Sequence, residues 1–118
     1  MSGDPPLSGD DLVRVLGTLA NPHRLRVIAA LARERAYVSR LARDLGISRA
    51  LLQVHLRKLT AAGLVSAQLE LSEDGKAMKY YEVKPFVLRL TPELIAVAVR
   101  TLTPPDAADR DGAGGWSE

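Results

Sequence analysis

The chain of 118 residues contains no cysteine. This absence excludes disulfides, thiolate nucleophiles and the thiolate sites that bind soft transition metals. The chain also lacks an apolar run long enough to span a membrane, and it has no basic-then-apolar start of the kind that directs secretion. The sequence therefore predicts a soluble, cytoplasmic protein with no cofactor, and its length leaves room for one domain with a modest core.

Acidic residues are scarce in the first half of the chain. Between Leu12 and Ser66, ten Arg or Lys residues stand against only two acidic ones, a net charge of +8. From Thr103 to Glu118 the balance reverses, with four acidic residues against one arginine. A basic segment attracts a polyanion such as nucleic acid, but arginines that merely solvate helix surfaces would give the same count. Charge alone leaves both interpretations open.

The two ends of the chain differ in composition from the middle. Residues 1–8 are mostly small or polar with two prolines, and residues 103–118 are rich in Pro, Gly, Ala and Asp. We predict that both are disordered tails, the second of them acidic, on either side of one domain at residues 9–102. Trp116, the only tryptophan, lies in the second tail. We expect it to be solvated, with a role as an anchor for a partner as the alternative.

Capping and turn signals divide the middle of the chain into helices and strands. Apolar residues recur at helical spacing over 10–20, and Asn21 followed by Pro22 predicts the start of a second helix over 22–35. Its expected inward face consists of Leu25, Ile28, Ala29 and Ala32. Tyr37 and Val38 are β-formers, and Ser39 is the expected cap of a short helix that Gly46 ends.

A further helix follows the cap residue Ser48 and ends at Gly63. Residues 64–71 then alternate as a strand with one apolar face, and an Asp-Gly pair predicts a hairpin turn to a partner strand over 77–83. Thr91 and Pro92 begin a last helix that is apolar on nearly all sides through Leu102. The fold class is therefore mainly α with a β-hairpin wing, a winged helix-turn-helix.

In that fold the helix after the turn enters the DNA major groove, and here it is the helix that follows Ser48. Its leucines Leu52, Leu56 and Leu59 lie in one narrow sector, which leaves the opposite side free to meet bases. Arginine can pair with guanine, glutamine with adenine, and valine can meet a thymine methyl group. The candidate base-reading residues are Ser48, Arg49, Ala50, Gln53, Val54 and Arg57.

Other basic residues on neighbouring elements are suited to neutralise phosphates without reading sequence. The candidates are Arg40, Arg43, Lys58, Lys76 and Lys79, the last two on a hairpin that we expect to be basic. The alternative is that all these residues solubilise an ordinary exposed face. The helix, the turn and the wing in this order favour DNA binding.

Three stretches of the chain resemble the ArsR/SmtB family of dimeric bacterial transcription factors. They are LGTLANPHRLRVIAAL, LARDLGISRALLQVHLRKLTAAGLV and GKAMKYYEV. The resemblance implies an operator-binding homodimer, usually a repressor, with the first and last helices packed across a two-fold axis. The wide apolar arcs of those helices favour the same assembly. The expected dimer interface is Leu12, Val13, Leu16, Leu94, Ile95, Val97, Ala98 and Leu102.

The chain departs from this family at the positions of its usual metal sites. Tyr37 and Ser39 stand where many members have a Cys-x-Cys pair, and the last helix offers only Glu93 as a ligand. We therefore expect neither usual site. His23 with Asp10 or Asp11 could form a weak site for nickel or zinc, with an exposed surface histidine as the alternative. His55 is expected to be partly buried and structural, rather than a ligand or a DNA contact.

Two other classes of function remain as alternatives to a regulator that binds double-stranded DNA. The chain could be a protein-interaction subunit of a two-protein sensor, in which a protein co-regulator supplies the ligand site, for instance for nickel or zinc. An enzyme is the weakest alternative. The chain shows no recognisable Ser-His-carboxylate arrangement and no phosphate-binding glycine loop.

Overall fold

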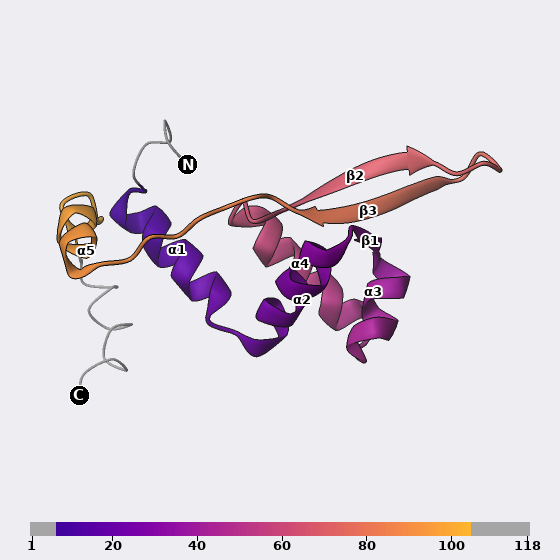
Figure 1. Ribbon diagram of the computed structural model, residues 1–118, viewed down its shortest axis with the longest axis horizontal. Coiled ribbons are helices and arrows are strands. Elements are labelled where there is room, and N and C mark those ends of the chain that lie inside the picture. Colours follow the sequence, from indigo (N-terminus) through magenta and orange to yellow (C-terminus); the bar gives the residue numbers. More distant parts are fainter. Residues whose placement is uncertain (1–6, 105–118) are drawn as a thin grey trace.

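The computed structural model describes residues 7–104, which form five helices and a three-stranded antiparallel sheet. Figure 1 shows these elements along the molecule. The helices and strands are α1 (Gly9–Leu19), α2 (Pro22–Arg33), β1 (Ala36–Tyr37), α3 (Val38–Leu45), α4 (Arg49–Ala61), β2 (Val65–Leu71), β3 (Ala77–Val83) and α5 (Pro92–Val99). This order confirms the expected mixture of helices with a β-hairpin.

Short-range signals in the sequence fix most helix ends. The Asn21 side chain accepts hydrogen bonds from the backbone N–H groups of His23 (2.9 Å) and Arg24 (3.2 Å), and Pro22 occupies the first turn of α2. Gly46 ends α3 in the left-handed conformation (φ 70°), which favours glycine. The Thr91 hydroxyl likewise caps α5. These three predictions are confirmed.

The core lies between α2, α3 and α4 and the part of the sheet nearest to them. Its largest fully buried side chains are Leu41, Leu52, Leu56, Leu59, Val27 and Val65. The strand order is β1-β3-β2, and β1 pairs with β3 through Ala36 and Tyr81, both of which are buried. Burial of this kind contributes about 1.5–3 kcal/mol for each large apolar side chain, so these six residues supply much of the stability of the domain.

The predicted inward face of α2 is wrong. Leu25 is 53% exposed, and Ala29 and Ala32 are also exposed, whereas Val27 and Leu31 are buried. Of the predicted face only Ile28 packs against the core, and it does so while partly buried. The helix is therefore rotated about its axis relative to the prediction, although its start and length are close to those expected.

The predicted cap of α3 is also wrong. The helix begins at Val38, one residue before Ser39, and its N-cap residue Tyr37 makes no side-chain capping bond. Tyr37 belongs to β1, so the chain passes from strand to helix with no separate capping turn. The pairing of β1 with β3 fixes this entry to α3.

The β2–β3 hairpin extends away from the helices (Figure 1). Its register runs from Val65 opposite Val83 to Leu71 opposite Ala77, and Gly75 in the turn has a positive φ of 86°. The predicted apolar face of β2 is buried only at Val65, whereas Leu69 and Leu71 are 72% and 77% exposed. The strands are as expected, but most of the hairpin reaches beyond the core.

At the other end of the molecule α5 packs beside α1, and an extended segment over residues 84–91 connects it to the hairpin (Figure 1). Ser8 caps α1 by accepting a hydrogen bond from the Asp11 N–H, and the Thr103 N–H donates to the Asp10 carboxylate at 3.0 Å. Ser8 and Thr103 are thus attached to the domain, although they were assigned to the tails. Trp116 and most of both tails lie outside the described residues.

Over residues 7–104, no helix has the length and apolar character needed to cross a bilayer.

Candidate nucleic-acid interface

Helix α4 presents a fully anchored inner face. Leu52, Leu56 and Leu59 are each 0% exposed, and the Ser48 hydroxyl caps the helix by accepting a hydrogen bond from the Leu51 N–H at 3.0 Å. Gly63 (φ 79°) follows the helix and turns the chain into β2. A helix held in this way cannot roll on the core without exposing leucine side chains, so its outer face has a fixed orientation.

The predicted base-reading residues lie on the outside of α4 and in its cap. Arg49, Ala50, Val54 and Arg57 are exposed, as is Ser48, whereas Gln53 is only partly exposed. Sequence reasoning missed Leu51, which is 39% exposed and comparable with Val54 at 37%. The position of Leu51 next to Leu52 could have indicated this exposure, because adjacent residues of a helix point in different directions and only Leu52 lies on the buried face. The geometry brings these side chains together on one helix, and their role in reading bases stays a prediction.

The residues predicted to contact phosphates differ in whether their charges are already paired and in where they lie. Arg40 already pairs with Glu34 at 2.5 Å and with Asp44 at 3.6 Å, whereas Arg43 on the same helix is exposed. Lys58 lines a shallow hollow between α4 and the C-terminal half of α1, away from Arg57 on the helix circumference. Arg43 is therefore the more available of the two arginines of α3.

The hairpin is acidic and not basic, which corrects the expectation. Residues 65–83 contain four carboxylates and two lysines, Lys76 and Lys79. The pKa of Asp74 in the turn is lowered, chiefly by a hydrogen bond from the Ser72 hydroxyl. Glu70 pairs with Arg35, whose guanidinium also lies 4.5 Å from the centroid of the Tyr80 ring. Contacts between this hairpin and phosphates therefore depend on the two lysines alone.

His55 is the one buried titratable side chain of α4, at 5% exposed. Its Nδ1 accepts a hydrogen bond from Arg24 Nε at 3.2 Å, so the neutral ring carries its proton on Nε2, which has no hydrogen-bond partner among the described residues. Burial, followed by the positive charges of its neighbours, lowers the pKa of His55. The His23 ring stacks on it, with 5.4 Å between centroids. His55 is thus more deeply buried than the partly buried residue that we predicted, and its contacts with Arg24 and His23 agree with a structural role.

The weak nickel or zinc site that His23 could form with Asp10 or Asp11 is not assembled within one chain. The two aspartates lie at the start of α1, and His23 follows its end, which is roughly 15 Å away at about 1.5 Å per residue. Asp10 bonds Thr103 and Asp11 pairs with Arg14. Throughout residues 7–104, no group of three His, Cys, Asp or Glu residues could hold a metal ion.

The residues present do not fit the thiolate metal site of the family either. The resemblance matches Tyr37 and Ser39 to the two cysteine positions of that site. The Tyr37 ring packs edge-on against Tyr80 with 5.6 Å between centroids, and neither side chain offers a soft ligand.

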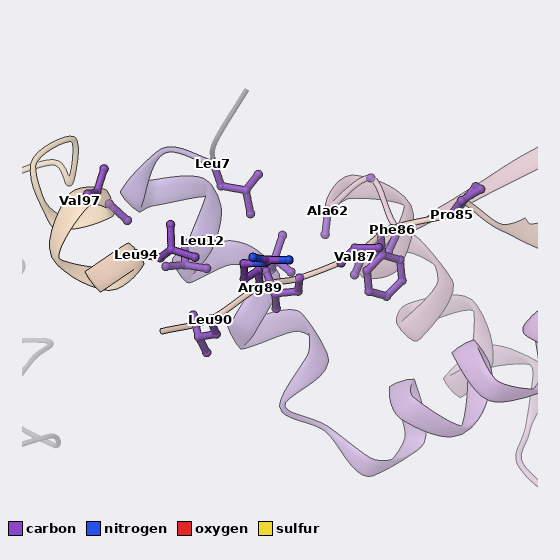
Figure 2. Close-up of a pocket in the computed structure, with 15 residues that line it drawn as sticks. Leu7, Leu12, Ala62, Pro85, Phe86, Val87, Arg89, Leu90, Leu94 and Val97 are labelled. Atoms are coloured by element: carbon purple, nitrogen blue, oxygen red, sulfur yellow. The ribbon is translucent and has the colours of Figure 1, made fainter. Parts of the chain in front are cut away.

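Helices α1 and α5 expose a broad apolar surface, as expected for a dimer interface. Val13, Ile95 and Val97 are 60%, 42% and 47% exposed, Leu16, Leu94 and Leu102 are exposed to a lesser extent, and Leu12 is partly buried. Ala98 differs, because it is buried against α1 within the same chain. Figure 2 shows Leu12, Leu94 and Val97 among the residues that line a cavity of about 720 Å³ between α1, α5 and the 84–91 segment.

A helix-turn-helix followed by an antiparallel hairpin defines this chain as a winged helix-turn-helix protein. The family model for bacterial regulatory proteins of the ArsR family matches residues 21–67, which include α2 to α4 and the start of β2. An uncharacterised HTH-type transcriptional regulator of Methanocaldococcus jannaschii is 34% identical over 85 residues, which are 72% of this chain and 88% of that protein. The HTH-type transcriptional regulator CmtR of Mycobacterium bovis is 33% identical over 104 residues, with coverage of 87% and 85%. The chain belongs to the ArsR family, so it is a regulatory protein and not an enzyme, as the sequence predicted.

Solved structures show the same fold. NolR from Sinorhizobium fredii superposes with a TM-score of 0.55 at 26% identity, over 82% of this chain and 92% of that chain. The homodimeric winged helix-turn-helix DNA-binding domain Mb0332 of Mycobacterium bovis superposes with a TM-score of 0.57 at 23% identity, over 85% of each chain.

Proposed function

We propose that this chain is a sequence-specific DNA-binding transcriptional regulator that acts as a homodimer on a palindromic operator. One observation carries the proposal: α4 is anchored by three leucines with no exposed surface, while Arg49 and Arg57 project from its other side. A major groove accepts a helix of this kind, and arginine is suited to bond guanine in bidentate fashion.

The exposed residues of α3 and α4 suggest how the roles are divided. Arg49, Gln53 and Arg57 follow each other at intervals of four residues, so they form one row along α4 that can reach successive base pairs. Arg43 would contact phosphate directly, whereas Arg40 would exchange its bonds to acidic neighbours for bonds to phosphate. Lys76 and Lys79 would make the contacts of the hairpin.

The dimer is proposed to form through α1 and α5. Their apolar side chains are exposed on a small protein, where a contiguous patch of this kind usually marks an interface. The structural relative Mb0332 is described as homodimeric, which supports the same assembly. A two-fold axis would place the two copies of α4 in successive major grooves, about 34 Å apart. A dimer that covers a promoter would act as a repressor.

The proposal is tested by selection from a random duplex library, followed by binding measurements on the enriched sequence and on a scrambled duplex. We expect preference for the enriched sequence and an affinity that falls steeply with salt. Arg57→Ala removes one bidentate base contact of about 1–3 kcal/mol from each half-site, so it should weaken specific binding of the dimer by about 30- to 20,000-fold. Arg100→Ala removes the same charge at the end of α5, remote from α4 (Figure 1), and is the matched control once sedimentation equilibrium shows that it dimerises like the wild type.

Two results would contradict the proposal. Equal, weak binding to both duplexes would favour the protein-interaction subunit, and a search for a protein partner would follow. Equal losses for Arg57→Ala and Arg100→Ala would show that overall charge, and not the outer face of α4, determines binding.

A further inference from the structure

The outer face of α4 has two chemically different sides. On one side is the polar row of Arg49, Gln53 and Arg57. On the other side Ala50 and Leu51 lie within four residues of Val54, so the three form one apolar patch over the first turns of the helix. Leu51 and Val54 are 39% and 37% exposed, although α4 already buries three leucines completely. We call these three residues the α4 patch.

Among residues 7–104, neither Leu51 nor Val54 belongs to the core or to the partly buried side chains packed against it, and the α4 patch is not part of the proposed dimer surface. It lies on α4, whereas the dimer surface lies on α1 and α5 at another part of the molecule (Figure 1). It adjoins Arg49 and Arg57, within a stretch of chain that carries a net charge of +8. A partner that contacts both must combine negative charge with apolar groups, and DNA does so in its major groove, where each thymine presents a 5-methyl group.

We propose that the α4 patch selects operators by contacting thymine methyl groups in each half-site, an inference that rests on the proposed function. An apolar patch cannot satisfy the amino group of cytosine, so a C·G pair in the same place would lose water without gaining a hydrogen bond. A T·A pair instead buries its methyl group against Ala50, Leu51 or Val54. The patch therefore specifies thymine, while the polar row specifies guanine and adenine.

The size of the effect follows from the burial of one methyl group. Burying one such group changes affinity by about fourfold, so loss of one contact in each half-site of a symmetric operator should weaken binding about fifteenfold. The probe is the duplex enriched from a random library by the wild-type protein. Each symmetric pair of thymines is replaced in turn by deoxyuridine, which lacks only the methyl group.

We expect one or two of these replacements to weaken binding by about fifteenfold and the rest to have little effect. Replacing the cytosine of a C·G variant by 5-methylcytosine at the same position should restore part of the affinity. Val54→Ala and Leu51→Ala should bind the thymine duplex more weakly and lose most of their sensitivity to deoxyuridine. Leu25→Ala, at an exposed leucine of α2, is the matched control and should keep the wild-type sensitivity.

The outcomes separate this inference from the function on which it rests. Failure to enrich any sequence would overturn the proposed function and the thymine contacts together. Enrichment of an operator in which no deoxyuridine replacement changes affinity as much as twofold would leave the regulator intact and overturn the thymine contacts. Wild-type sensitivity in Val54→Ala and Leu51→Ala would also overturn them. Circular dichroism of each variant establishes that α4 is still folded.

Discussion

A single methyl group added at Gly9 should separate α5 from α1. Gly9 is buried in the first turn of α1, and its N–H donates to the Thr101 hydroxyl at 2.7 Å. A Cβ at this position would lie 2.3 Å from the Ala98 carbonyl oxygen and 2.7 Å from Leu102 Cγ. Both distances are far below contact distance, and the nearer atom belongs to backbone that cannot rotate away. Gly9→Ala therefore requires α5 to move.

The cost can be worked from these contacts. The Ala98 carbonyl must retreat by about 1 Å to reach ordinary contact, and overpacking of this kind typically costs about 1–3 kcal/mol. Loss of the hydrogen bond to Thr101 adds about 0.5–1.5 kcal/mol. If α1 and α5 form the dimer interface together, a cost of about 1.5–4.5 kcal/mol would weaken dimerisation by roughly 12- to 1,600-fold.

Sedimentation equilibrium measures the dimer dissociation constant, and urea denaturation measures the free energy of unfolding. Gly17→Ala is the matched control, because it adds the same methyl group to the same helix, where no heavy atom of the described residues lies within 4 Å. Removal of a glycine from the interior of α1 should stabilise this variant by about 0.5–1 kcal/mol. A Gly9→Ala protein that dimerises like the wild type would refute the argument, and so would equal losses of dimerisation in the two variants.

Three further predictions concern the core and the surface. Because the pKa of His55 is lowered in the folded protein, its contribution to stability should be present above pH 6.5 and be lost as pH falls through the folded value; urea denaturation from pH 5 to 8 should show this slope, which His55→Leu should flatten. Leu56→Ala removes a completely buried side chain and should cost about 2–5 kcal/mol in the same assay, and a loss below 1 kcal/mol would mean that α4 is not anchored as described. The Arg35–Glu70 pair is 44% exposed on both sides, so a double-mutant cycle should give a coupling of no more than about 1 kcal/mol, and a larger value would show that the pair is more than a surface ion pair.

The features that the sequence predicted well depend on neighbours along the chain. Asn21 and Thr91 cap helices because a short polar side chain precedes a proline in the first turn, and Gly46 and Gly63 end helices because they adopt positive φ. Each signal involves residues only a few positions apart. The order of elements, and from it the winged helix-turn-helix, could therefore be predicted without knowledge of the tertiary structure.

The features that the sequence predicted wrongly depend on distant contacts. In α2, Leu25, Ile28 and Ala32 fit helical spacing as well as Val27 and Leu31 do, because the helix carries apolar residues around most of its circumference. The packing of α2 against α3, α4 and β3 determines that Val27 and Leu31 are the buried residues. Alternation likewise predicted the strands of the hairpin, but it cannot show how far a hairpin extends beyond the core that should cover it.

Leu51 was missed for the same reason: the sequence does not show which of several similar apolar residues the tertiary contacts bury. This division of the leucines matters for the proposed DNA interface. Four leucines of α4 look alike in the sequence, yet Leu52, Leu56 and Leu59 hold the helix while Leu51 faces outward. The inner leucines fix the helix to the core, and the outer face contributes little to that attachment. In the proposed docking, stability and base recognition are therefore carried by different side chains of one helix. Changes to the outer face can alter the preferred operator while the free energy of unfolding stays nearly constant, since surface substitutions usually change it by no more than about 0.5 kcal/mol. A family with this arrangement can acquire new operators without first acquiring extra stability.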